Sequence, residues 1–249
     1  MALYRLPGLP LIQPGDELAP LLVAAAERAG LEFRDGDVLA VAQKIVSRSE
    51  GRFVDLADIE PSDEARRLAG ITGKDARAVE LVLRESRSVI RAAPGVLIVE
   101  HRLGIVLANA GIDRSNVAGR EDLVLLLPED PDRSAAQLRD ELQQRVETRL
   151  GVIVIDSVGR PWRLGTTGLA IGCAGVPALL DLRGRPDLYG RPMQVAEIAP
   201  ADSLAGAAAL LCGEGEEGTP AVLIRGYPGG DNEQSARDVL RPAAEDLFR

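Results

Sequence analysis

The chain has 249 residues, of which 46% are hydrophobic and 27% charged, and its formal net charge at pH 7 is −9. This composition predicts a soluble globular protein, either one compact domain or two closely joined lobes. The acidic balance and an aromatic content of 3% argue against binding to nucleic acid. No run of about 20 apolar residues occurs and residues 1–10 lack the layout of a signal peptide, so we expect a cytoplasmic protein without a membrane partner.

The predicted elements mix helices and strands without a strict βαβ period, which favours an α+β fold with a mixed sheet. Helical spacing of apolar residues indicates helices, and short apolar runs bounded by Gly, Pro or acidic residues indicate buried strands. In chain order we expect a helix over residues 18–29, a strand over 37–43, a helix over 76–85, strands over 95–99 and 122–127, a helix over 134–150, a strand over 151–155, a helix over 203–211 and a strand over 221–224.

The helix over residues 134–150 has the clearest signals. Ser134 and Gln137 match a capping box, and apolar residues recur at every fourth position, at Leu138, Leu142, Val146 and Leu150. We expect this helix to lie against the sheet. The helix over 203–211 is expected to end at Gly213.

The cysteine and histidine content removes several kinds of catalytic site. Cys173 and Cys212 cannot form a disulfide framework or a four-cysteine zinc site, so we interpret both as small buried residues in a reducing compartment. His101 is the only histidine, which excludes a histidine-rich zinc site and leaves any Ser-His-Asp triad dependent on that one residue. We interpret His101 as structural.

Two glycine-rich segments match parts of phosphate-binding motifs but lack the necessary context. Residues 70–74 have the wrong spacing for a phosphate loop, and Asp75 stands where Ser or Thr is needed, so we interpret them as a turn between helices. Residues 213–218 match G-x-G-x-x-G, yet they follow a predicted helix instead of a strand. Their glutamates and the negative end of that helix suit a cation that bridges to a phosphate, and a solvated acidic turn is the alternative.

The turn within residues 107–116 favours a site for Mg²⁺ or Mn²⁺. It brings Asp113 together with two amides and a hydroxyl, and such hard oxygen donors suit these cations. An ordinary turn-forming aspartate is the alternative interpretation.

A second such place lies within residues 152–163. A buried strand delivers Asp156 and Ser157 at its end, and a glycine turn then presents Arg160 and Arg163, which would neutralise phosphate or carboxylate charge. Solvated surface arginines are the alternative. Residues 181–191 repeat the mixture of arginine, glycine and aspartate, and they form either a binding segment for an anionic substrate arm or a simple loop.

The motifs, taken in order, resemble the coenzyme F420-0:L-glutamate ligase family. The matching segments span nearly the whole chain: residues 8–12, 36–39, 43–51, 109–116, 126–132, 156–163, 170–175, 187–191, 213–215 and 245–249. The resemblance implies an enzyme that joins a carboxylate of the deazaflavin precursor coenzyme F420-0 to the amine of L-glutamate, then extends the tail through γ-glutamyl links, driven by GTP. It also implies one ligase domain over residues 1–249, without the nitroreductase-like domain that some relatives carry.

The resemblance assigns roles to individual positions. It implies that GTP is contacted by Leu9, Pro10, Leu11, Ile12, Gln43, Lys44, Arg48, Asn116, Gly213, Glu214, Gly215, Glu216, Glu217 and Gly218. It implies a Mg²⁺ or Mn²⁺ site at Asp113, Asp156, Ser157 and Glu214, K⁺ as a further ion, and an intertwined homodimer. Where many relatives have lysine this chain has Arg48, whose planar fork keeps the charge, so we expect phosphate contact with a changed geometry.

We therefore expect catalysis by positioning and charge neutralisation at Asp113, Asp156, Arg160 and Arg163. In this hypothesis, metal ions at the two aspartates bridge the GTP phosphates, the substrate carboxylate takes the γ-phosphoryl group, and the acyl phosphate reacts with the glutamate amine. Two other functions fit the same residues: a metal-dependent kinase or nucleotidyl transferase acting on another acceptor, and a non-catalytic GTP-binding regulatory module.

Overall fold

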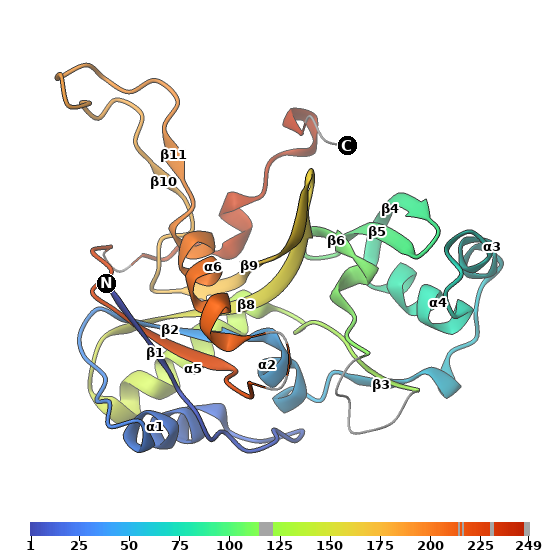
Figure 1. Cartoon of the computed structure of the whole chain (residues 1–249), viewed down its shortest axis with the longest axis horizontal. Helices are drawn as coiled ribbons and strands as arrows, with labels where there is room; N and C mark the ends of the chain where they lie inside the picture. Colours follow the sequence, from blue (N-terminus) through green and yellow to red (C-terminus); the bar gives the residue numbers. More distant parts are fainter. Residues whose placement is uncertain (115–121, 214, 216, 230–231, 247–249) are drawn as a thin grey trace.

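The structure, a computed structural model, describes residues 1–114, 122–213, 215, 217–229 and 232–246. Its centre is a five-stranded mixed sheet with the strand order β1-β12-β2-β8-β9, which confirms the predicted α+β class (Figure 1). β2 and β8 run parallel, and the other neighbouring pairs are antiparallel. The strands are β1 (Ala2–Arg5), β12 (Ala221–Arg225), β2 (Asp37–Ala42), β8 (Leu150–Arg160) and β9 (Arg163–Ala174).

Helices cover both faces of this sheet, because side chains along each strand alternate between the faces. Leu39 and Val41 pack on one face with α1 (Leu18–Arg28) and α5 (Pro131–Val146). Val38 and Ala40 pack on the other face with α6 (Pro200–Cys212). Figure 1 shows α6 on the face opposite α1 and α5. A sheet that is buried on both faces needs strands that are apolar throughout, which explains the continuous apolar run of β2.

The smaller elements lie beside the central sheet, between β2 and β8 in the sequence (Figure 1). β3 (Phe53–Asp55) pairs with β7 (Leu123–Leu125), while β4 (Ser86–Ala93), β5 (Val96–His101) and β6 (Val106–Ala108) form an antiparallel sheet. α3 (Asp63–Thr72) and α4 (Ala76–Arg84) pack with this sheet through an apolar cluster of their own. Gly73 ends α3 with φ of 71°, so the turn between helices that was predicted at residues 70–74 begins only at Gly73, and residues 70–72 belong to α3.

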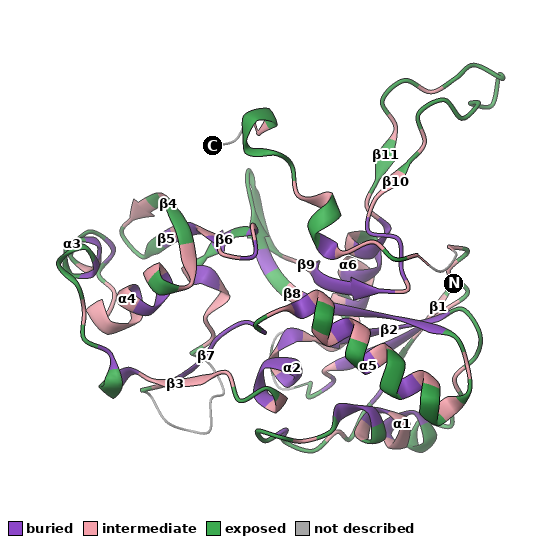
Figure 2. Ribbon diagram, turned by 180° about the vertical axis from the view of Figure 1, so that it is seen from behind, coloured by how far each residue is buried: buried purple, intermediate pink, exposed green. Residues whose placement is uncertain are grey.

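Two segments extend away from the body of the molecule. β8 and β9 continue beyond the sheet as a hairpin, and residues 180–198 form a long arm that starts from the pair β10 (Leu180–Asp181) and β11 (Glu197–Ile198) (Figure 1). Figure 2 shows that the ends of both segments are largely exposed. None of the described helices is long and apolar enough to span a membrane.

The structure corrects the boundaries of the long predicted helix. α5 begins at Pro131, and the Asp130 side chain accepts a hydrogen bond from the Arg133 amide, so Ser134 is not its cap. Proline is favoured at the first helical position, so Pro131 marks the start of α5. The prediction instead followed the capping-box match at Ser134 and Gln137. The helix ends at Val146 because Glu147 adopts a left-handed conformation, and Leu150 opens β8 instead.

Three further differences concern the sheet, and one is that β1 was not predicted. α2 (Gln43–Ser49) begins directly where β2 ends, so Gln43 is helical and not part of the strand. β9 was not predicted, because three glycines interrupt its apolar pattern. Packing requires two of them: a β-carbon at Gly168 would lie 2.2 Å from the Ala205 carbonyl oxygen of α6, and one at Gly172 would lie 2.2 Å from the Pro131 carbonyl oxygen of α5.

Candidate active site

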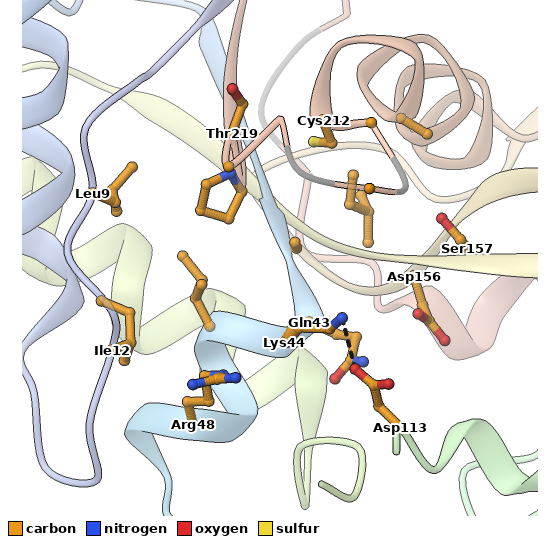
Figure 3. Close-up of a pocket in the computed structure, with 18 of the residues that line it drawn as sticks. Leu9, Ile12, Gln43, Lys44, Arg48, Asp113, Asp156, Ser157, Cys212 and Thr219 are labelled. Atoms are coloured by element: carbon orange, nitrogen blue, oxygen red, sulfur yellow. Dashed lines mark ion pairs between the residues drawn. The ribbon is translucent and has the colours of Figure 1, made fainter. Parts of the chain in front are cut away.

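A cavity of about 620 Å³ opens beside the end of β2 (Figure 3), and this volume suits a small-molecule ligand. The structure brings together at its wall most of the predicted site residues: Leu9, Pro10, Leu11, Ile12, Gln43, Lys44, Arg48, Asp113, Asp156, Ser157, Gly213, Gly215 and Gly218. The lining also includes residues that the sequence analysis missed, which are mostly small or apolar and carry no chemical signature: Ala42, Ile45, Ala108, Gly111, Ile112, Ile155, Ala209, Cys212, Thr219 and Pro220.

Asp113 is positioned by an unusual turn after β6. Asn109, Ala110 and Gly111 have φ values of 53°, 53° and 66°. A left-handed conformation is unfavourable for residues with a side chain, and such strain collects at functional sites. Asp113 then exchanges two backbone hydrogen bonds of 2.9 Å with Leu125, which hold it at the cavity wall.

β8 carries Asp156 and Ser157 at the point where the strand leaves the core. Ile155 is buried, Asp156 is half-buried and Ser157 is exposed. A register shift between β8 and β9 at this point leaves Ile171 without a partner, and such bulges re-aim side chains beside active sites. The prediction that a buried strand delivers this pair is confirmed, but the strand does not end there, because it continues to Arg160.

α2 brings a cation to the carboxylate. Lys44 Nζ lies 2.7 Å from Asp113 Oδ2, and the two side chains are 37% and 15% exposed. Figure 3 shows this ion pair and places Asp113 and Asp156 on the same side of the cavity, opposite Leu9 and Ile12. The cavity therefore has a charged side and an apolar side.

α2 also carries three buried polar side chains beside this ion pair. Gln43, Ser47 and Arg48 are each at most 4% exposed. Ser47 Oγ donates a 2.9 Å hydrogen bond to Gln43 Oε1, four residues earlier on the same helix face. The Arg48 guanidinium lies 5.9 Å from the centre of the Phe53 ring, which orients the side chain while its charge remains at the cavity wall.

The loop after α6 contributes glycines to the cavity wall and, among its described residues, no carboxylate. Gly213, Gly215 and Gly218 line the cavity, but Glu217 does not. The Glu217 carboxylate is exposed and accepts a 2.8 Å hydrogen bond from the Gly215 amide, and backbone hydrogen bonds of this kind lower its pKa. For Glu217 the structure favours the solvated turn. Asn116, Glu214 and Glu216 lie outside the described residues.

The structure does not place Arg160 and Arg163 at the cavity. They face each other at the exposed tip of the β8–β9 hairpin, where the chain turns through Pro161 and Trp162 and not through Gly159. Within a single chain these arginines do not line the cavity, so their catalytic role stays a prediction. The sequence placed them near Asp156, but an extended strand carries successive residues about 3.3 Å further away.

Residues 181–191, predicted to be either a binding segment for an anionic substrate arm or a simple loop, lie on the arm over residues 180–198. One of its arginines pairs with carboxylates of the arm itself: Arg183 Nη2 lies 2.7 Å from Asp181 Oδ2 and 3.2 Å from Glu197 Oε1. This segment is an exposed loop, and it does not line the cavity.

The lone histidine and the two cysteines have different surroundings. His101 is fully buried and lies outside the cavity; its Nδ1 accepts a hydrogen bond from the Leu103 amide and its Nε2 lies 3.6 Å from Glu85 Oε2, so its structural role is confirmed. Cys173 is buried, and desolvation raises the pKa of its thiol to about 12. Cys212 is half-buried and lines the cavity, so its interpretation as a buried residue is wrong.

The residues at the charged side fit a hard divalent cation that also binds a phosphate. Among the described residues, no three His, Cys, Asp or Glu side chains come close enough together to hold a metal alone. Asp113 and Asp156 offer two carboxylates and Ser157 a hydroxyl. Mg²⁺ is commonly bound by one or two carboxylates together with water and substrate phosphates, so this partial set suits Mg²⁺ or Mn²⁺.

Comparison with known proteins identifies relatives along the whole chain. A family model described as F420-0:Gamma-glutamyl ligase matches residues 8–226. Proteins named Coenzyme F420:L-glutamate ligase are similar to the chain: that of Methanopyrus kandleri is 46% identical over 96% of this chain and 93% of its own length. Those of Methanothermobacter thermautotrophicus and Archaeoglobus fulgidus are each 43% identical, over 100% and 99% of this chain and 99% and 95% of their own lengths.

Proposed function

Since the chain belongs to the F420-0:gamma-glutamyl ligase family, we propose that it attaches L-glutamate to coenzyme F420-0 through an amide bond, with GTP as co-substrate and Mg²⁺ or Mn²⁺ as the metal. It is an acid–amino-acid ligase, as its relatives are named to be. Further glutamates are then added through γ-glutamyl links.

One observation carries the assignment of the site. Asp113, Asp156 and Lys44 come from three separate segments and converge on one side of a cavity of about 620 Å³. Carboxylates that share a wall with an ammonium and a buried guanidinium suit a metal–phosphate ligand, because the cation satisfies the carboxylates and the basic side chains balance the phosphates. The glycines after α6 let a ligand approach the backbone closely.

The proposed reaction has two steps. A carboxylate oxygen of coenzyme F420-0 attacks the γ-phosphorus of GTP, the bond to the β-phosphate oxygen breaks, and GDP leaves. The glutamate amine then attacks the acyl carbon, phosphate departs, and the nitrogen loses a proton to give the amide. A bound divalent metal supplies charge neutralisation for the phosphates. Asp113 and Asp156 would hold that metal, while Lys44 and Arg48 would orient the phosphate oxygens.

We further propose a homodimer, on the basis of the exposed apolar side chains at the ends of the two extensions. Leu188, Tyr189 and Val195 on the arm are 100%, 86% and 87% exposed, and Leu164 at the hairpin tip is 100% exposed. Large apolar side chains that gather on an exposed surface are typical of interaction sites. Sedimentation equilibrium at micromolar concentration should give twice the mass of the 26.4 kDa chain, and Leu188→Glu combined with Tyr189→Glu should yield the monomer.

Product analysis tests the proposed reaction. Coenzyme F420-0, L-glutamate, GTP and Mn²⁺ or Mg²⁺ are incubated with the protein, with and without K⁺, and the deazaflavin is analysed by mass spectrometry. The expected result is a deazaflavin heavier by one or more glutamyl residues, with GDP and phosphate released in equal amounts. A phosphorylated or nucleotidylated acceptor would instead identify a kinase or nucleotidyl transferase. Calorimetric binding of GTP without any turnover would identify a regulatory module.

A further inference from the structure

The Asp113 carboxylate already has a cation beside it in this structure. Its Oδ2 atom is buried, and Lys44 Nζ lies 2.7 Å from that atom. An ammonium and a divalent metal compete for the same carboxylate oxygen, because two positive charges at that separation repel each other strongly in a partly buried site. The approach of a metal to Oδ2 therefore favours movement of the Lys44 ammonium away from Asp113.

Position 44 holds a lysine, a residue type that is rare in this chain. Of its 29 basic residues, only Lys44 and Lys74 are lysines. Arginine would clamp the carboxylate with a planar, two-point fork, whereas lysine makes a single-point contact through a flexible stem and is displaced more readily. The Lys44 side chain is 37% exposed and lines the cavity, so it has open space into which to swing.

We propose that Lys44 is a displaceable counter-ion of Asp113, a positioning residue that holds the carboxylate until a divalent cation replaces it and that then turns to the nucleotide phosphates. The inference rests on the proposed function, because it takes Asp113 as a metal ligand. It couples the two ligands: the metal releases the ammonium, and the nucleotide offers the released ammonium a new anionic partner. Metal and nucleotide therefore strengthen each other's binding.

Binding of Mn²⁺ in the absence of nucleotide, followed by electron paramagnetic resonance, measures the competition directly. Lys44→Met keeps the length of the side chain but removes the competing charge, so we expect Mn²⁺ to bind about 2- to 5-fold more tightly than to wild type, the size expected for loss of a partly exposed ion pair. Lys44→Arg keeps the charge and should not tighten binding. Lys74→Met, which changes the other lysine, should match wild type.

Addition of GDP provides the second half of the test. In wild type, GDP should increase the affinity for Mn²⁺, and in Lys44→Met this increase should be reduced by a similar factor, since no ammonium is released to meet the phosphates.

The displacement can also be observed in wild type by NMR, without any substitution. With lysine labelled at the ε-carbon with ¹³C, the protein has only two lysine signals in the NMR spectrum. Mg²⁺ should shift the Lys44 signal and leave that of Lys74 in place.

Failure of this inference and failure of the proposed metal site give different results. If Asp113→Asn loses Mn²⁺ binding but Lys44→Met binds Mn²⁺ no more tightly than wild type, and Mg²⁺ leaves the Lys44 signal unmoved, then the displacement is wrong and the metal site stands. If Asp113→Asn binds Mn²⁺ as wild type does, the metal site itself is wrong. Circular dichroism of each variant establishes that it is folded, and the NMR measurement on wild type is independent of any folding defect.

Discussion

Asp37 and Arg225 form a buried ion pair that joins the first residue of β2 to the last residue of β12. Arg225 Nε and Nη2 donate to the two carboxylate oxygens at 2.9 and 2.7 Å, and Asp37 is 1% exposed. The pair does not stand alone: the Arg34 amide also donates to Asp37, and the Arg225 guanidinium lies 5.8 Å from the ring centre of Tyr4 on β1. These contacts connect three segments at one end of the central sheet.

Removal of the arginine should destabilise the fold strongly. Arg225→Met leaves the Asp37 charge buried without its partner, and we expect the free energy of unfolding in urea to fall by about 3–5 kcal/mol. Arg149→Met is the control, because Arg149 lies 3.9 Å from Asp35 and both side chains are more than half exposed. That control should be close to wild type. Equal stability of the two variants would show that the buried pair does not hold the sheet together.

The contact between β9 and α6 should be intolerant of even one methyl group. Gly168→Ala places a β-carbon 2.2 Å from the Ala205 carbonyl oxygen, a backbone atom that cannot move without displacing the helix. We expect a loss of about 1–3 kcal/mol in the free energy of unfolding. Gly159→Ala on the same hairpin has no heavy atom within 4 Å of the new β-carbon and should change stability little. An unchanged free energy of unfolding in Gly168→Ala would mean that α6 lies further from β9.

The stability of the protein should depend on pH through Glu85. Burial would raise the pKa of this carboxyl, but the nearby His101 ring, the hydrogen bond from Arg102 and the charges of Arg102 and Arg52 outweigh it and lower the pKa from 4.5 to about 2. Since the folded pKa lies below the unfolded one, ionised Glu85 stabilises the fold above about pH 4.5. This contribution is lost as the pH falls toward 2.

Glu85→Gln isolates this effect. Between pH 6 and pH 3, wild type should lose roughly 2 kcal/mol more of its unfolding free energy than Glu85→Gln does. Chemical denaturation at a series of pH values measures the difference. A gap between the two proteins that stays constant over this range would show that Glu85 does not titrate with the depressed pKa.

The metal assignment predicts a loss of activity without a loss of fold. Asp113→Asn and Asp156→Asn each remove one charged oxygen ligand, and we expect kcat/KM to fall at least about 100-fold at ordinary metal concentration. The circular dichroism spectra should remain those of wild type. Asp140→Asn serves as the control, because Asp140 is exposed on α5, and it should be fully active. Full activity in either cavity variant would remove that aspartate from the metal site.

Cys212 should report occupancy of the cavity. It lines the cavity and is half-buried, whereas Cys173 is buried and its raised pKa, about 12, keeps it as the unreactive thiol. A maleimide should therefore label one thiol in the native protein and none in Cys212→Ser. GDP together with Mn²⁺ should slow the labelling at least several-fold. Labelling at an unchanged rate with these ligands bound would place the nucleotide elsewhere.

Much of this protein was determined by local sequence. Continuous apolar runs predicted β2, β8 and β12, because a strand buried on both faces must be apolar throughout, and the family resemblance identified nearly all of the polar residues at the cavity. Asp113 and Asp156 stood out because carboxylates follow apolar segments at both places. Such signals lie within a few neighbouring residues, so they can be recognised without knowledge of the tertiary structure.

Other features depended on contacts between distant segments, and only the tertiary structure decided them. The glycines of β9 interrupt a strand pattern but are required where α5 and α6 press on the strand. Arg160 follows Asp156 closely in sequence, yet extended backbone carries it to the exposed tip of the hairpin. Lys44 meets Asp113 only because α2 lies against β7, where Leu125 pairs with Asp113. Pairings of this kind depend on how chain segments pack in space, which no local pattern encodes.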